Sequence, residues 1–203
     1  MDDLPTKATL LFKLRDPADS ATWDEFVELY TPLISRYCAS RGVATGDIAD
    51  VTQDTMLRVA KAIRSFEYDP ARGKFRSWLF RVTYSSLARH FEKKNRQPDS
   101  LGHSAMQRLL DKTPSEEAET DWDLNYRRQM FQWASAKVKP EFEEKTWNAF
   151  WRTAVESEPG ASVGEALGMS PGAVYVAKSR VIARLRERVA SVTGELELPQ
   201  LSG

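Results

Sequence analysis

The sequence is poor in the residues that most often carry out chemistry. It has one cysteine, Cys38, and two histidines, His90 and His103, among 203 residues. A single cysteine excludes an internal disulfide and a zinc site built from several cysteines, and its place on the apolar side of a predicted helix favours a buried small hydrophobe. Phosphate-binding glycine loops and nucleophile–base pairs are also missing. The sequence therefore predicts a protein that is not an enzyme and that uses no cofactor or metal.

Long apolar runs are missing too. No stretch approaches the roughly 18 apolar residues that a membrane-spanning helix needs. The N-terminal residues MDDLPTKATLLFKLRD, which predict a short helix, lack the apolar core and small-residue cleavage site of a signal peptide. We therefore expect a cytoplasmic protein without membrane insertion. Its 203 residues suffice for one large or two small domains, each with a core.

The chain has no net charge, but only as a sum, because 29 basic side chains cancel 29 acidic ones. Locally, residues 72–96 hold eight Lys or Arg and one acid, residues 99–125 seven acids and two bases, and residues 171–189 five bases and one acid. The chain is thus basic, acidic and basic in turn. This pattern favours two basic domains, joined by an acidic linker, that could each meet a polyanion.

The first basic segment predicts a long helix with two different faces. The apolar stripe, which should face the core, is Phe80, Tyr84, Leu87 and Phe91. The opposite stripe is Trp78, Arg81, Ser85 and Arg89. Cations, a hydroxyl and an exposed ring suit a phosphate backbone and an unpaired base. A solvated basic helix with Trp78 in the core is the alternative that this segment alone leaves open.

Two helices are predicted before the basic segment. The first should begin at a capping box formed by Thr22 and Glu25 and run as a core helix to Gly42. The second, over residues 47–65, should bury Ile48, Val51, Thr55, Val59 and Ile63 and expose Asp47, Asp50, Asp54, Arg58 and Lys61. Its three carboxylates could bind a metal, pair along the helix or dock on a partner, and the helix by itself leaves these readings open.

The C-terminal basic segment predicts a helix-turn-helix over residues 162–189. Ser162 and Glu165 should cap a short helix that ends at Gly168, and Ser170 should cap the next, with Pro171 in its first turn. Gly164 allows the two helices to approach. The second helix should bury Val174, Val181 and Leu185 and present Gly172, Tyr175, Val176, Ser179, Ala183 and Arg186, flanked by Lys178, Arg180 and Arg184. Such a helix can enter a major groove.

In this arrangement the chain resembles the bacterial RNA polymerase sigma factors, specifically the small two-domain extracytoplasmic-function (ECF) group. The segment DIADVTQDTMLR (residues 47–58) is similar to the family's region 2.2, and residues 68–79 resemble its FDPxxGxFxxWL pattern. Residues 122–156 and the helix-turn-helix resemble regions 4.1 and 4.2. The resemblance implies an all-α fold with a region 2 domain (1–96), a flexible acidic linker (97–121), a region 4 domain (122–192) and a tail (193–203).

The resemblance also implies partners and site residues. We expect binding to core RNA polymerase through its beta-prime clamp and beta flap and to promoter DNA as duplex and single strand, with an anti-sigma factor as a further candidate partner. Polymerase docking is expected at Asp47, Asp50, Gln53 and Asp54. Minus-ten recognition and melting are expected at Phe75, Arg76, Trp78, Arg81, Ser85 and Arg89. Minus-thirty-five recognition is expected at Ser170, Gly172, Tyr175, Val176, Lys178, Ser179 and Arg180.

Some positions depart from the family pattern. Many relatives have asparagine where this chain has Ser85, and often Lys-Ser-Arg where it has Tyr175, Val176 and Ala177, so we expect different promoter preferences. The acidic linker corresponds to the segment that threads the RNA exit path in relatives. Its charge also resembles a nucleic-acid mimic, though solvation alone would explain it. The alternative function is an autonomous helix-turn-helix regulator. It leaves unexplained the aromatic segment over residues 68–79 and the carboxylates of the predicted helix over residues 47–65.

Overall fold

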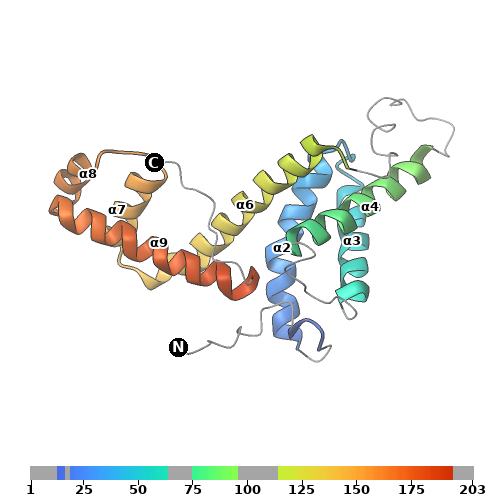
Figure 1. Ribbon diagram of the computed structural model, residues 1–203, viewed down its shortest axis with the longest axis horizontal. Coiled ribbons are helices and arrows are strands. Elements are labelled where there is room, and N and C mark those ends of the chain that lie inside the picture. The colour runs from blue at the N-terminus through green and yellow to red at the C-terminus, as the bar shows by residue number, and fades with distance from the viewer. Residues whose placement is uncertain (1–12, 17–18, 64–74, 96–113, 194–203) are drawn as a thin grey trace. The chain divides into compact units, whose positions relative to one another are not determined.

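The computed structural model describes residues 13–16, 19–63, 75–95 and 114–193 (Figure 1). The regular structure in these ranges is entirely helical, which confirms the predicted all-α fold. The helices are α2 (Ser20–Ser40), α3 (Ile48–Ala62), α4 (Phe75–Asn95), α6 (Glu116–Val138), the 3-10 turn η2 (Lys139–Glu141), α7 (Glu144–Ala154), α8 (Gly160–Leu167) and α9 (Pro171–Thr193). The described ranges leave out all or most of four predicted segments: the short N-terminal helix, residues 68–74 of the segment that resembles FDPxxGxFxxWL, the linker and the tail.

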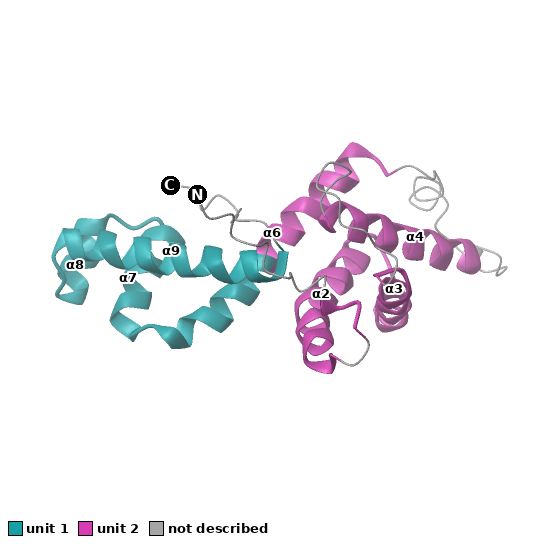
Figure 2. Cartoon of the chain, turned by 60° about the horizontal axis from the view of Figure 1, so that its bottom comes forward, with its two compact units in different colours: residues 1–10, 130–203 teal, residues 11–129 magenta. Residues whose placement is uncertain are grey.

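The chain divides into two compact units, which Figure 2 shows in different colours. The N-terminal unit is Leu11–Gln129, and the C-terminal unit is Met130–Gly203 together with Met1–Leu10. The division falls inside α6, which therefore contributes residues 116–129 to the first unit and 130–138 to the second. The predicted domain boundaries at 96 and 122 stay predictions.

Helix α6 begins at Glu116, inside the segment that the composition assigned to the linker. The Ser115 side-chain oxygen accepts a hydrogen bond from the backbone N–H of Ala118 at 3.2 Å, which caps the helix. Acidic residues fill its first turn, where the positive end of the helix dipole favours them. The acidic composition of residues 116–121 is therefore that of a helix start.

Helix α2 supplies the centre of the N-terminal unit. Seven of its side chains are fully buried: Phe26, Leu29, Tyr30, Leu33, Ile34, Tyr37 and Cys38. Burial raises the pKa of the Cys38 thiol to about 11, so it is a core residue, as predicted. The predicted capping box is wrong, because Asp19 is the N-cap and accepts from the Thr22 N–H at 3.0 Å and the Thr22 hydroxyl at 2.6 Å. Thr22 thus donates within the first turn.

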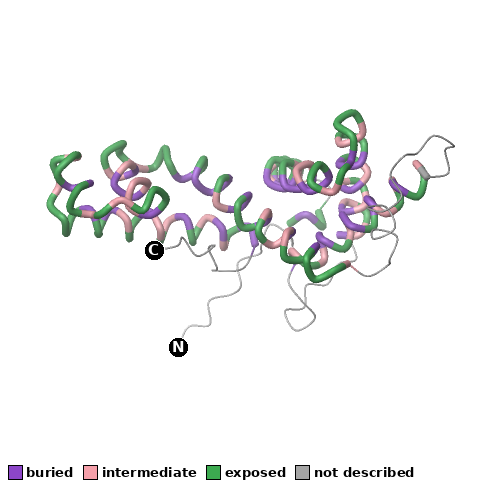
Figure 3. The backbone as a smooth tube through the Cα atoms, turned by 90° about the horizontal axis from the view of Figure 1, so that it is seen from above, coloured by how far each residue is buried: buried purple, intermediate pink, exposed green. Residues whose placement is uncertain are grey.

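Helix α3 packs on α2 and on α4. A hydrogen bond of 3.1 Å joins the hydroxyls of Ser35 and Thr52 across the α2–α3 contact. The buried residues of α4 include its whole predicted apolar stripe, Phe80, Tyr84, Leu87 and Phe91. Figure 3 shows that buried positions recur along the helices, as the 3.6-residue period requires.

The C-terminal unit packs α7, α8 and α9 together. Ala149, Val163, Val174 and Ala177 form a buried cluster at the meeting point of the three helices, with Leu167 and Met169 against it. Trp133, Trp147 and Phe150 are buried, whereas Phe142 and Trp151 are only half-buried. This core holds the two helices of the helix-turn-helix in place.

The tight turn between α8 and α9 depends on two glycines. Gly168 has a φ of 59°, in the left-handed region that glycine adopts easily. A Cβ on Gly164 would lie 2.7 Å from the Met169 carbonyl oxygen. The predicted box of Ser162 and Glu165 is wrong, since α8 begins at Gly160 behind Pro159 and has no side-chain cap. Proline fixes the backbone there without a capping side chain.

Candidate nucleic-acid and docking surfaces

The exposed stripe of α4 is the first candidate surface. Arg81, Ser85 and Arg89 are exposed and Trp78 is half-buried, so the four residues share one open face as the spacing predicts. The Trp78 ring leans on the Phe75 ring, with centroids 5.3 Å apart. Packing from beneath by Phe75 favours a fixed Trp78 orientation while part of the indole stays accessible. The structure therefore does not place Trp78 wholly in the core, which was the alternative that the sequence left open.

Phe75 and Arg76 lie apart from this stripe, on the packed side of α4. Phe75 is buried, with its ring centroid 5.6 Å from Tyr30 and 6.2 Å from Phe26. The Arg76 guanidinium pairs with Asp123 of α6 at 3.2 Å. In this conformation Phe75 packs under Trp78 of the open stripe, and Arg76 forms an ion pair with Asp123.

The polar side of α3 is the second candidate surface. Asp50 and Gln53 are exposed, and Asp54 is half-buried. Arg58 donates to both Asp54 carboxylate oxygens, from Nε at 2.6 Å and from Nη2 at 3.2 Å. Of the three readings given for these carboxylates, pairing along the helix therefore holds for Asp54. Within the described ranges, no group of three or more His, Cys, Asp or Glu side chains could hold a metal ion.

Asp47, at the N-cap of α3, faces the end of α4 instead. Its Oδ2 accepts a hydrogen bond from Lys94 Nζ at 2.9 Å and lies 3.7 Å from His90 Nε2. The hydrogen bond and positive charge of Lys94 lower the pKa of Asp47. Burial lowers the pKa of His90, although the charge of Asp47 acts to raise it. Asp47 thus fastens α3 to α4.

One exposed apolar residue on α3, Leu57, was not predicted from the sequence as part of any surface. Leu57 is 55% exposed, although it lies on the same helix as Asp50, Gln53 and Asp54. A large exposed side chain beside polar ones is the composition of many docking surfaces. Periodicity could have placed Leu57 on the outer side of α3 but could not distinguish an isolated exposed leucine from an anchor.

The outward side of α9 is the third candidate surface. Ser170 caps the helix by accepting from the Ala173 N–H at 3.2 Å, as predicted. Gly172, Tyr175, Val176, Ser179 and Arg180 are all exposed. Lys178 is half-buried and donates to the Thr153 carbonyl at 3.4 Å, so it braces α9 against α7 in this conformation.

Arg184 is also committed within the C-terminal unit. Its guanidinium donates to Glu141, with Nη2 to Oε1 at 3.1 Å, and to Glu187 at 3.1 Å. These hydrogen bonds raise the pKa of Arg184 and lower the pKa of Glu141. Of the arginines on this surface, Arg184 is held by Glu141 and Glu187, whereas Arg180 and Arg186 are exposed.

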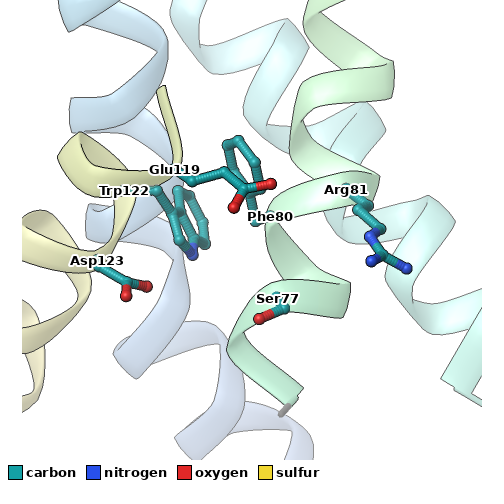
Figure 4. A pocket seen from close by; sticks show the side chains of 6 residues that line it. All are labelled: Ser77, Phe80, Arg81, Glu119, Trp122 and Asp123. Carbon is teal, nitrogen blue, oxygen red and sulfur yellow. The ribbon is translucent and has the colours of Figure 1, made fainter. Parts of the chain in front are cut away.

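A further contact was not predicted at all. The first half of α6 packs against α4, where a cavity of about 120 Å³ is lined by Ser77, Phe80, Arg81, Glu119, Trp122 and Asp123 (Figure 4). Trp122 lies beside Phe80, whereas the Arg81 guanidinium points away from Glu119. Trp122 is buried. The contact joins segments far apart in sequence, which composition and periodicity cannot pair.

None of the described helices is both long enough and apolar enough to be a candidate membrane span.

Basic open helices and helix-turn-helix motifs both occur in proteins that bind DNA, and this chain has one of each. Comparison with known families is more specific, because residues 26–97 match the model for sigma-70 region 2. The ECF RNA polymerase sigma factor SigE of Mycolicibacterium smegmatis is 25% identical over 195 residues, which cover 95% of this chain and 71% of SigE. Residues 26–97 therefore match a sigma-70 region 2, and the curated relatives of this chain are ECF RNA polymerase sigma factors.

Other relatives match over a shorter stretch. The ECF RNA polymerase sigma-E factors of Salmonella typhimurium and Escherichia coli are 31% identical over 75 residues, which cover 37% of this chain and 35% of theirs. The solved structure of CnrH in complex with the cytosolic domain of CnrY aligns with 89% of this chain and 94% of CnrH, at a TM-score of 0.34 and 18% identity. A TM-score this low supports no conclusion about this chain.

Proposed function

We propose that the protein binds core RNA polymerase, directs it to specific promoters and helps to separate the DNA strands at the minus-ten element. The observation that carries this proposal is the open stripe of α4, which lies inside the segment that matches sigma-70 region 2. There Arg81 and Arg89 can neutralise phosphates, and the accessible part of Trp78 offers a surface for an unpaired base. Stacking of one base contributes about 1–3 kcal/mol, which biases strand separation without nucleotide hydrolysis.

We assign polymerase docking to the polar side of α3. Asp50 and Gln53 are exposed, and Asp54 keeps a partly exposed carboxylate beside Arg58. Asp47 belongs to the same proposed surface but is held by Lys94, so its main contribution is to fix the start of α3. Leu57 adds an apolar contact to this surface.

We assign the minus-thirty-five element to the outward side of α9. Tyr175 and Val176 are 61% and 57% exposed and can contact thymine methyl groups, and Ser179 can hydrogen-bond to base edges. Arg180 and, after release from Thr153, Lys178 can meet phosphates. Because this side has few polar groups, much of its selectivity should come from DNA shape and backbone contacts.

The test of the polymerase assignment is co-elution of the purified protein with bacterial core RNA polymerase in size-exclusion chromatography. We expect a stable complex. Absence of a complex, combined with specific binding of the protein alone to duplex DNA, would contradict the proposal and support an autonomous helix-turn-helix regulator.

A further inference from the structure

The first half of α6 is docked on the N-terminal unit through a continuous stripe, and the surfaces assigned above do not explain it. Ala118, Trp122, Tyr126 and Gln129 follow one another at spacings of four, four and three, and all four are buried. This is the pattern of a helix with one face packed on a neighbour. Residues 116–129 therefore form a docked element and not a solvated acidic spacer.

Trp122 is the main apolar anchor of this element. Its ring centroid lies 5.1 Å from Tyr37 of α2 and 5.6 Å from Phe80 of α4. The indole Nε1 donates to the Arg76 carbonyl at 3.1 Å. Trp122 is only 1% exposed, so its removal would leave a large gap between α2 and α4 and weaken the docking.

Charged and polar contacts flank the anchor on both sides. Asp121 pairs with Arg41 just beyond α2 at 2.6 Å, and Asp123 pairs with Arg76 of α4 at 3.2 Å. Further along, the Gln129 amide accepts from Arg36 and donates to the Leu29 carbonyl at 3.0 Å. Three arginines of the N-terminal unit are thus held by acceptors on one helix.

The surface beneath residues 116–129 has the chemistry of a nucleic-acid site. The Arg41 and Arg76 side chains are only 20% and 19% exposed while the helix is docked. The Arg41 guanidinium lies over the Tyr37 ring, 5.0 Å from its centroid, and Trp122 of the docked helix packs against both the Tyr37 and the Phe80 ring. Arginines beside aromatic rings are the combination that binds a phosphate backbone and its bases.

We propose that residues 116–129 are a built-in competitor of nucleic acid. While docked, their carboxylates and Trp122 cover the surface formed by Arg36, Arg41, Arg76, Tyr37 and Phe80; when they undock, that surface binds the phosphate backbone of single-stranded DNA. The inference rests on the proposed function, which makes DNA the ligand of this unit. The apparent affinity of the free protein for DNA is reduced by the fraction of molecules in which the surface is open.

The first test removes the anchor without changing charge. Binding of a fluorescein-labelled single strand of about 20 nucleotides of mixed sequence is measured by anisotropy for the full chain, for Trp122→Ala and for Leu124→Ala. Leu124 lies on the same helix but is 59% exposed, which makes it the matched control. We expect Trp122→Ala to bind about threefold or more tightly than the wild type, and Leu124→Ala to bind like the wild type.

The second test keeps Trp122 in place, in case the first variant folds poorly. Asp121→Asn with Asp123→Asn removes the two acidic partners of Arg41 and Arg76. Glu116→Gln with Glu117→Gln removes the same amount of charge from exposed positions of the same helix. We expect the first pair to tighten binding about threefold more than the second. Hydrogen exchange of residues 116–129 should rise when the strand binds the wild type.

Equal affinities for Trp122→Ala and the wild type, together with equal effects of the two charge pairs, would overturn the competitor inference. So would the failure of all variants to bind the strand, because release of the helix would then open no nucleic-acid site. A different result would contradict the proposed function: the absence of a complex with core RNA polymerase. The strand-binding experiment does not measure that complex, so the two failures can be told apart.

Discussion

At the scale of single residues, the proposed strand opening depends most on Trp78. It is half-buried on Phe75 and open on the side of Arg81 and Arg89. We expect Trp78→Ala to reduce open-complex formation roughly fivefold or more, since one stacked base is worth about 1–3 kcal/mol, and to affect closed-complex binding much less. Permanganate footprinting measures the opened bases.

Trp78→Phe is the matched control, because it keeps an aromatic surface at the same position. It should retain most of the opening activity. Equal losses of closed-complex binding and opening in Trp78→Ala would remove the stacking role and leave Trp78 as a packing residue.

Asp47 makes a pH-dependent contribution at the residue scale. Its pKa in the folded protein lies below the usual 3.8 because of Lys94. A carboxyl with a lowered folded pKa stabilises the fold above its unfolded pKa and loses this contribution as the pH falls through the folded value. We therefore expect Asp47→Asn to melt at a lower temperature than the wild type at neutral pH, and the difference to shrink as the pH falls below 3.8 and to vanish only below the folded pKa.

The effect should be small and should shrink in high salt, since the Asp47 and Lys94 side chains are 40% and 43% exposed. Thermal denaturation followed by circular dichroism measures it. Asp50→Asn serves as the control, because Asp50 is exposed on the outer side of the same helix. A difference that persisted at low pH would contradict the role given to the Asp47–Lys94 pair.

At the scale of elements, α3 is expected to behave as a docking helix. Asp50→Lys with Asp54→Lys should weaken binding to core RNA polymerase by about tenfold or more, because like charges juxtaposed at an interface cost several kcal/mol. The fold should survive, since neither side chain is fully buried. Surface plasmon resonance against immobilised core measures the affinity.

A matched charge reversal is available outside α3. Glu92→Lys with Glu165→Lys changes the net charge equally at two exposed positions, one on α4 and one on α8. It should leave core affinity nearly unchanged. If both double variants bound core as tightly as the wild type, α3 would not be the docking helix.

The helix-turn-helix offers a second test at this scale. Gly164→Ala should destabilise the C-terminal unit by about 1–3 kcal/mol, the usual range for overpacking, because the new Cβ would lie 2.7 Å from the Met169 carbonyl oxygen. Gly172→Ala meets nothing within 4 Å and should be neutral or slightly stabilising. Urea denaturation of the full chain measures both, and equal stability of the two variants would contradict the close approach.

Periodicity predicted the elements where one helix face decides burial. It placed Phe80, Tyr84, Leu87 and Phe91 inside and Arg81, Ser85 and Arg89 outside, as the structure does. It missed helix starts where the capping group lies earlier in the chain, as Asp19 does for α2. Asp19, three residues upstream of Thr22, accepts the Thr22 N–H and so moves the helix start back by one turn, which leaves Thr22 inside the helix.

At the scale of the whole molecule, contacts between distant segments could not be predicted from the sequence. The acids of residues 116–121 indicated a linker because nothing local shows that Asp121 pairs with Arg41, far away in sequence. For the same reason the sequence, which placed Arg76 among the minus-ten residues, could not show that its guanidinium pairs with Asp123 of α6. The functions proposed for α3 and α9 come from the family resemblance, because periodicity alone left them open.

The two units should also divide the reading of a promoter between them. Tyr175→Ala or Ser179→Ala, both exposed on α9, should change selection at the minus-thirty-five element by about 1–3 kcal/mol per altered base contact and leave the minus-ten preference as it is. Selection from a randomised promoter library followed by sequencing measures both elements at once. A shift of the minus-ten preference would reverse the assignment of the two units.

Run-off transcription from a promoter library by core RNA polymerase, with and without the protein, tests the central claim most directly. The account predicts new, sequence-selective transcripts that appear only when the protein is present and that share a minus-ten and a minus-thirty-five element. An unchanged set of transcripts, despite a stable complex with core, would contradict it.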